Sequence, residues 1–115
     1  MGADSVVLCY GLRFSLGSDS QLSNEELESL EDGTEARVAA ARRVGLQSQF
    51  GRVTDGGEYF LLIGMLFGPF GIQGRERGEF PDAVLAETAA RTKRLLREAG
   101  LDGEPALHVQ LEAQY

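Results

Sequence analysis

A ten-residue stretch, from Glu58 to Phe67, limits the possible folds of this chain more than any other segment. Between Tyr59 and Phe67 it is apolar at both odd and even positions, apart from Gly64. Successive side chains of a β-strand point to opposite faces of the sheet, so a run that is apolar on both sets is typical of a strand covered on both faces. The run is too short to cross a membrane as a helix. It predicts the central strand of a sheet.

The flanking sequence predicts three more strands. Alternation of apolar and polar residues indicates a first and a last strand, and a weaker polar segment precedes the central strand. The turn residues Asp55-Gly56-Gly57 would join that segment to the central strand as a hairpin. The predicted strands are residues 6–16, 47–54, the central run and 107–113.

Helix signals fall in the two long segments between strands. Ser23 and Glu26 have the spacing of a capping box, which predicts a helix start at Ser23. The sequence Asp32-Gly33-Thr34 interrupts the pattern, so we expect a short helix and then a second one running from Thr34 to Gly45. Another helix is expected from Asp82 to Ala99, where Gly100 ends it.

The order strand, helix, strand, strand, helix, strand predicts a single α+β domain over residues 1–115. Its simplest arrangement is the ferredoxin-like βαββαβ fold, a four-stranded antiparallel sheet of order 4-1-3-2 with the helices on one face. We expect a right-handed crossover from strand one to a parallel central neighbour. The connections after strands one and three would then leave the sheet at the same end.

The charge and the cysteine content of the chain argue against some classes of partner and some cellular locations. The net charge of −7 and the pI near 4.6 argue against nucleic acid and anionic membranes as partners. A single cysteine, Cys9, excludes an internal disulfide framework, and the apolar segment after Asp4 is too short for a signal sequence. We therefore expect a cytoplasmic location. The single lysine, Lys93, and the many Ala and Gly residues indicate a GC-rich bacterial genome.

No motif for catalysis, a metal or a cofactor stands out. The chain has one histidine, His108, and one cysteine, too few for a zinc site without carboxylates. Cys9 is expected to be structural, although His108 would approach it if the first and last strands pair in a suitable register. The glycine-rich segment 68–81 lacks the spacing and the lysine of a phosphate-binding loop. We expect no cofactor, no metal and no catalytic residue.

The leading functional prediction is association. The predicted helices cover one face of the sheet, yet the central strand is apolar on both faces, so the other face should expose an apolar patch. A homodimer or another protein partner docking there would cover it. The residues predicted to form this interface are Val7, Cys9, Phe60, Leu62, Leu66 and His108.

The alternative prediction is a binder or an enzyme for a small anionic metabolite. If the loops 17–22 and 68–81 lie at one end of the sheet, the N-termini of two helices and two arginines meet there. The predicted ligand-binding residues are Ser18, Phe70, Arg75 and Arg77. A surface loop in which Phe70, Ile72 and Phe80 fold back onto the sheet edge explains residues 68–81 equally well.

Overall fold

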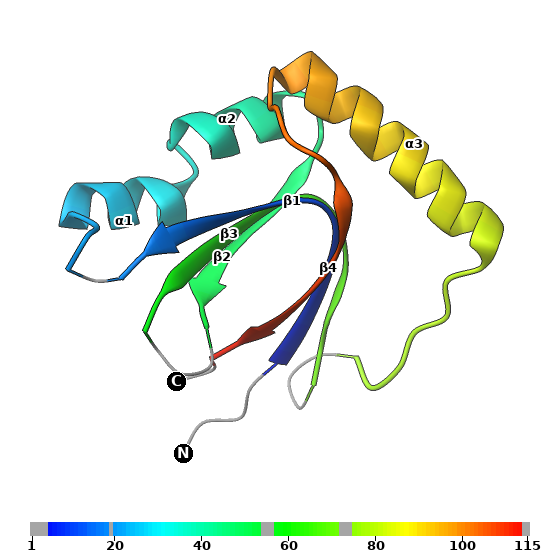
Figure 1. The fold of residues 1–115 in the computed structure, drawn as a ribbon, viewed down its shortest axis with the longest axis horizontal. Helices are drawn as coiled ribbons and strands as arrows, with labels where there is room; N and C mark the ends of the chain where they lie inside the picture. Colours follow the sequence, from blue (N-terminus) through cyan, green and yellow to red (C-terminus); the bar gives the residue numbers. More distant parts are fainter. Residues whose placement is uncertain (1–4, 19, 54–56, 72–74, 114–115) are drawn as a thin grey trace.

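The computed structural model describes residues 5–18, 20–53, 57–71 and 75–113. These residues form one antiparallel sheet of order β2-β3-β1-β4, which read from β4 is the predicted order 4-1-3-2 (Figure 1). The architecture is α+β. The elements are β1 (Ser5–Gly17), α1 (Asn24–Asp32), α2 (Ala36–Arg43), β2 (Gln47–Arg52), β3 (Tyr59–Phe70), α3 (Asp82–Ala99) and β4 (Ala106–Glu112).

The predicted helix boundaries are largely confirmed, because capping chemistry is local. Ser23 Oγ accepts a hydrogen bond from the Glu26 N–H at 3.1 Å and begins α1. Gly33 ends α1 with φ of 84°, a left-handed conformation that favours glycine. The second helix is capped by Glu35 rather than Thr34, since the Glu35 carboxylate accepts from the backbone N–H groups of the first turn of α2. The predicted break between the two helices is therefore present.

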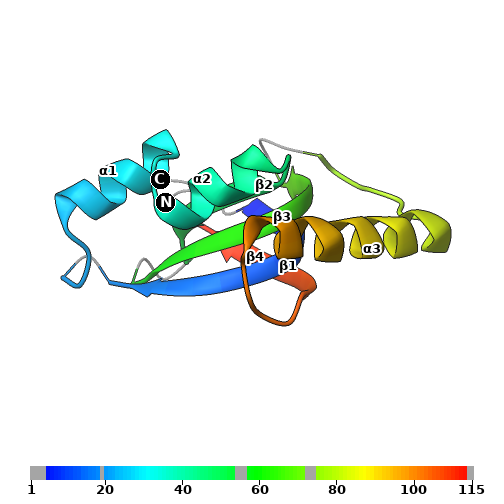
Figure 2. The ribbon, with the colours of Figure 1, turned by 90° about the horizontal axis from the view of Figure 1, so that it is seen from above.

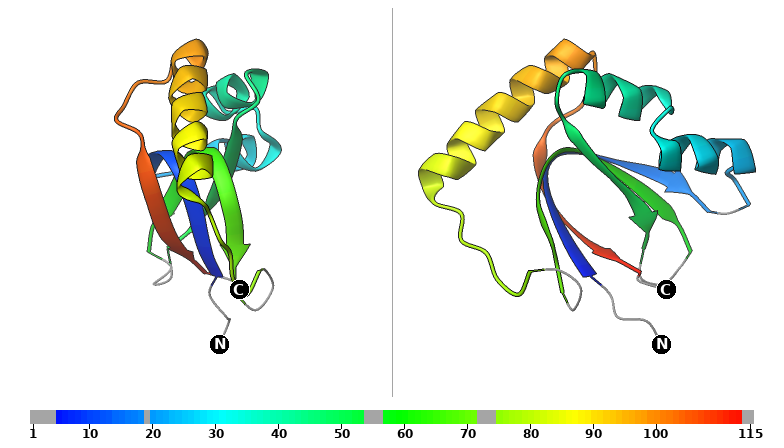
Figure 3. Two further views of the ribbon diagram at one scale, coloured as in Figure 1. Left: turned by 90° about the vertical axis from the view of Figure 1, so that its right-hand side faces the viewer. Right: turned by 180° about the vertical axis from the view of Figure 1, so that it is seen from behind.

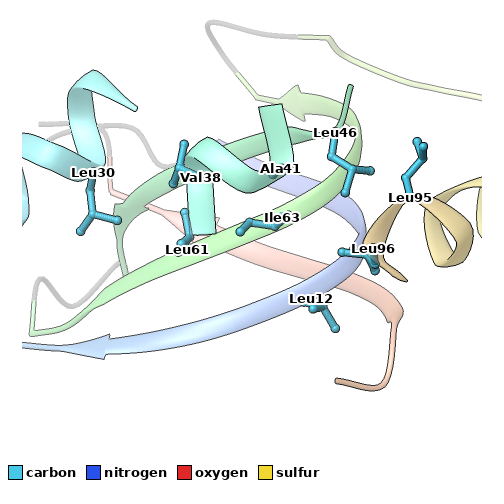
Figure 4. Packing of buried hydrophobic residues seen from close by; sticks show 9 residues of the cluster. All are labelled: Leu12, Leu30, Val38, Ala41, Leu46, Leu61, Ile63, Leu95 and Leu96. Carbon is cyan, nitrogen blue, oxygen red and sulfur yellow. The ribbon is translucent and has the colours of Figure 1, made fainter. Parts of the chain in front are cut away.

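The main core lies between the helices and one face of the sheet. Figure 2 shows α1 and α2 over one part of the sheet, with α3 extending in the opposite direction. Leu12 of β1 and Leu61 and Ile63 of β3 point towards these helices (Figure 4). The buried members of this cluster are Leu12, Leu30, Val38, Ala41, Leu46, Leu61, Ile63, Leu95 and Leu96.

The sheet is strongly bent, which the sequence analysis did not anticipate. β1 and β3 curve midway along their length, so the sheet curls away from the helices (Figures 1 and 3). Gly11 and Gly64 lie directly opposite each other near the middle of these strands. A Cβ on Gly11 would lie 2.0 Å from the Ile63 carbonyl oxygen, and a Cβ on Gly64 would lie 2.0 Å from that of Tyr10. Only glycine permits this close approach, and glycine within a strand often marks such a bend.

The bend brings the two edge strands together. The N–H of Ala113, just after β4, donates to the Arg52 carbonyl oxygen of β2 at 3.1 Å. Gln49 Nε2 donates to Glu112 Oε1 at 2.7 Å. Gly51 leaves room for this contact, because a Cβ there would lie 2.7 Å from the Glu112 carboxyl carbon. The sheet thus closes on itself at one end, and its inner face, opposite the helices, is enclosed by the chain's own strands.

The relative direction of β1 and β3 corrects a sequence prediction. The two central strands are antiparallel, with Val6 opposite Phe70 at one end and Gly17 opposite Tyr59 at the other. The strand parallel to β1 is β2, which lies beyond β3. The prediction of a parallel central neighbour is wrong, and so is the prediction that the connections after β1 and β3 share one end of the sheet.

Some predicted boundaries also change. β3 continues to Phe70, three residues into the segment that was predicted to be a loop. β2 ends at Arg52, where the backbone N–H of Val53 donates to the Glu58 carbonyl oxygen at 2.9 Å. The predicted turn residues Asp55 and Gly56, and Ile72 of the long loop, lie outside the described residues.

Candidate functional site

The predicted interface residues lie on the enclosed inner face, which corrects the predicted exposed patch. Val7 is 1% exposed, and Cys9, Phe60 and Leu62 are 0% exposed. They form a second buried cluster inside the curled sheet, against which the half-buried Leu66 packs. The bend is the physical reason, since it lets β2 and β4 shelter side chains that a flatter sheet would expose. These buried residues therefore present no docking surface.

Cys9 and His108 are directly opposite each other in the β1–β4 ladder, the register that would let them meet. His108 Nε2, however, is 3.1 Å from the Gly11 carbonyl oxygen, a hydrogen bond that engages the ring. Burial raises the pKa of the Cys9 thiol to about 12. The thiolate is the nucleophilic form of cysteine, so this environment suits a structural side chain and not a catalytic one.

An exposed apolar surface lies instead on the outer, helix side of the sheet. Its most exposed members are on β4: Leu107 at 50%, Val109 at 65% and Leu111 at 50%. Each lies opposite an apolar, half-buried residue of β1 in the ladder. We call this surface the outer apolar face. Its residues are Val6, Leu8, Tyr10, Leu107, Val109 and Leu111.

The outer apolar face is left uncovered because α3 leaves the sheet. The buried residues of α3, Thr92, Leu95 and Leu96, all belong to its C-terminal half. Figure 1 shows the N-terminal half of α3 sloping away from the sheet. A groove of about 320 Å³ with almost wholly apolar walls lies between this half and the strands. It is lined by Tyr10, Phe67, Leu85, Ala86, Ala89 and Leu107.

A second, more open cavity lies at the end of β3. It has a volume of about 590 Å³, and its walls include Gln47, Arg75 and Phe80. The rings of Phe67 and Phe80 pack edge to face, with centroids 4.7 Å apart. A Cβ on Gly78 would lie 3.1 Å from the Phe70 ring. Phe80 thus folds back onto the end of β3, as one of the two sequence interpretations expected. Phe70 instead belongs to β3 itself, Ile72 lies outside the described residues, and Arg75 borders a cavity.

The structure does not assemble the predicted ligand-binding residues into one site. Ser18 follows β1 at the opposite end of the sheet from Phe70, and its hydroxyl lies 2.9 Å from that of Ser20. Arg77 forms an ion pair with Glu79, in which both side chains are 77% exposed. Arg75 and Phe70 remain close, since an isolated bridge pairs their backbones. Of the predicted set, Arg75 is the residue that lines a cavity.

Among the described residues, no group of three or more His, Cys, Asp or Glu side chains could hold a metal ion. No helix in the described ranges is long and apolar enough to cross a membrane. No protein-family model, curated protein or solved structure matches the chain.

Sequence reasoning missed the outer apolar face, although its members were visible in the alternation of the first and last strands. The missing information was the path of α3, which no local pattern specifies. A signal for the closed inner face did exist. Gly11 and Gly64 interrupt two strands of otherwise bulky residues, and interior strand glycines often mark bends.

Proposed function

We propose that this chain is a ferredoxin-like, non-catalytic domain of a reducing, cytoplasmic setting that acts by association, as a homodimer. The docking surface is the outer apolar face and not the inner face that the sequence suggested. The observation that carries the proposal is the exposure of Leu107, Val109 and Leu111, half or more of each side chain, on one face of a strand at the sheet edge. Two-fold homodimers are the commonest oligomers, and they bury a shared surface on both copies.

The energetics favour covering this face. Three large aliphatic side chains at this exposure, with their β1 neighbours, present apolar surface of order a few hundred Å², which is the size of the largest patch on a typical monomer and often marks a functional surface. At about 25 cal/mol per Å², burying it in both copies yields roughly 10 kcal/mol or more before the entropic cost of association. An association cost of at least about 4 kcal/mol leaves a net gain of about 6 kcal/mol, which corresponds to a dissociation constant of tens of micromolar.

Light scattering over a concentration series tests the proposal. The wild-type chain should be mostly dimeric at concentrations on the order of 500 μM, well above a dissociation constant of tens of micromolar. The double variant Leu107→Ser, Leu111→Ser should be monomeric with an unchanged circular dichroism spectrum. Val84→Ser is the matched control, because Val84 is 46% exposed but lies on α3, outside the outer apolar face. A wild-type chain that stays monomeric throughout would overturn the proposal.

The second candidate function is the binding of a small anion at the cavity beside Arg75, and the position of Arg75 in the cavity wall favours it. The guanidinium offers charge-assisted, bidentate donors to a phosphate or carboxylate.

The test of anion binding is thermal stability in the presence of millimolar inorganic phosphate, citrate or succinate, since a bound ligand stabilises the folded state. Arg75→Ala should abolish the shift in Tm. Arg77→Ala should retain the shift in Tm, because Arg77 is already paired with Glu79 and lies outside the cavity wall. Equal loss in both variants, or no shift with any anion, would reject this function.

A further inference from the structure

We propose that the partner copy joins along the free edge of β4, so that two β4 strands pair antiparallel about Val109 and the two sheets become one. This inference rests on the proposed homodimer and specifies its geometry. The alternative geometry is a dimer in which the outer apolar faces pack against each other without pairing of the strand edges.

In the part of the chain that the structure describes, no strand pairs with the outer edge of β4, and this free edge presents main-chain groups at the positions that carry the apolar side chains. Figure 3, left, shows β4 at the outer edge of the sheet, with β1 on its other side. The N–H of Ala113 points away from β1, because it donates to Arg52 on β2. The N–H and C=O groups of successive residues in a strand point alternately to its two sides. Those of Leu111, Val109 and Leu107, which follow from Ala113 in steps of two residues, therefore also point away from β1. The Leu111 carbonyl oxygen accepts from Gln110 Nε2 at 2.9 Å, a local bond that a partner N–H can replace.

This edge lacks the usual protections against pairing. Edge strands that stay single commonly carry lysine, proline or a bulge. Residues 106–111 contain no charged residue and no proline. The β1–β4 ladder runs without a shift from Ser5–Glu112 to Gly11–Ala106. At its far end the strand is engaged by β2, so the pairing surface is the regular stretch before Glu112.

The sequence of β4 selects the register. In an antiparallel pair, directly opposed residues share a face, so registers that place Leu107 opposite a polar residue of the partner are excluded. A two-fold axis at Val109 places Val109 opposite its own copy and Leu107 opposite Leu111 of the second copy. The polar residues His108 and Gln110 then also face each other. A shift of the axis by one residue towards the C-terminus would need Ala113, whose N–H is already bonded to Arg52.

The area fits a weak, specific contact. Pairing of the two edges covers the main-chain edge of the seven-residue β4 and the flanks of Leu107, Val109 and Leu111, while the rest of the outer apolar face stays exposed. A contact of this extent stays below about 1,200 Å² in total, the range of weak and transient interfaces. The inner face cannot add to it, because the chain's own strands enclose Val7, Cys9, Phe60 and Leu62. We therefore expect a reversible dimer rather than an obligate one.

Val109→Pro compared with Val109→Ala tests the pairing. Proline keeps an apolar side chain but removes the N–H that points to the free edge, and it is tolerated at such edge positions. Edge pairing predicts that Val109→Pro raises the dimer Kd at least 100-fold, while Val109→Ala, which keeps the N–H, raises it about 10-fold or less. Both variants should keep the wild-type circular dichroism spectrum. Amide exchange of Leu107 and Leu111 in the wild-type chain should also slow as its concentration rises.

A disulfide test fixes the register independently. Opposed residues of an antiparallel pair have Cα atoms about 5.5 Å apart, within reach of a disulfide, so Val109→Cys should oxidise to a covalent dimer. Leu111→Cys is the matched control, because its two copies would lie about 14 Å apart. Edge pairing would be overturned, but the homodimer kept, by three results obtained with a dimeric wild-type chain. These are equal increases in Kd for Val109→Pro and Val109→Ala, amide exchange that does not depend on concentration, and no Val109→Cys cross-link. A monomeric wild type would overturn both.

Discussion

Gln49 and Glu112 join the two edges of a single sheet: Gln49 Nε2 of β2 donates to Glu112 Oε1 of β4 at 2.7 Å. The two residues are 63 positions apart in the chain, and their strands are the outermost of the four. The contact closes the inner face over Val7, Cys9 and Phe60. It therefore decides which side of the sheet remains available to a partner.

Removing this contact should destabilise the domain modestly. Gln49→Ala takes away a donor to a carboxylate, an interaction worth about 1.5–3 kcal/mol in folded proteins, and the half-exposed position favours the lower value. Urea unfolding measures the change. In a double-mutant cycle with Glu112→Ala, the coupling energy should be about 1 kcal/mol. Strict additivity of the two variants would mean that the contact contributes nothing to closure.

The glycine pair at the bend should be intolerant of any side chain. Gly64→Ala forces a Cβ against the Tyr10 carbonyl oxygen, so we expect a loss of at least about 3 kcal/mol or failure to fold. Gly45→Ala is the matched control: its Cβ would meet nothing within 4 Å, and only the positive φ of 89° opposes it, for about 1–2 kcal/mol. Chemical denaturation compares the two. Equal losses would show that the close approach of β1 and β3 is not needed for the bend.

Burial of Cys9 should make stability depend on pH in the alkaline range. The pKa of the thiol rises from an ordinary value of 9.0 to about 12 on folding, because burial disfavours the thiolate. The stabilisation is complete below pH 9 and is lost as the pH approaches 12, at about 1.4 kcal/mol per pH unit. Urea midpoints between pH 8 and 10.5 should fall more steeply for the wild-type chain than for Cys9→Ala. Parallel slopes would contradict this assignment.

Cys9 should also resist alkylation in the native state. At pH 8, iodoacetamide should react with it only through opening of the fold, so the rate should rise sharply in urea near the unfolding midpoint. Mass spectrometry of intact protein follows the modification. Rapid labelling without denaturant would show that the inner face is accessible.

Association should strengthen with salt. Each chain carries a net charge of −7, so two copies repel each other over a distance that salt shortens to about 10 Å at 0.1 M. Raising NaCl from 20 to 300 mM should lower the dimer Kd by about three-fold or more, measured by sedimentation equilibrium. Anion binding at Arg75 should show the opposite trend, because salt screens attraction there. A dimer that weakens with salt would indicate that charge pairs, and not the outer apolar face, hold it together.

The type of most helices and strands, and several of their boundaries, could be deduced without the tertiary structure. The cap at Ser23, the break at Gly33, the end of α3 at Gly100, the alternation of β1 and β4 and the continuous apolar run of β3 all depend on residues within a few positions of each other. The order of the strands followed as well, since short connections and helical crossovers leave few arrangements.

Two features depended on the tertiary structure alone: the curvature of the sheet and the path of α3. Alternation along a strand has a period of two residues whether the sheet is flat or curled, so the pattern in β3 could not reveal that β2 and β4 meet at Gln49 and Glu112. The amphipathic pattern of α3 marks an apolar side but does not show that its N-terminal half leaves the sheet. The sequence by itself determined the local elements and the order of the strands. Its prediction of an exposed inner face was wrong, because the bend at Gly11 and Gly64 enclosed that face and left the exposed apolar surface on β4.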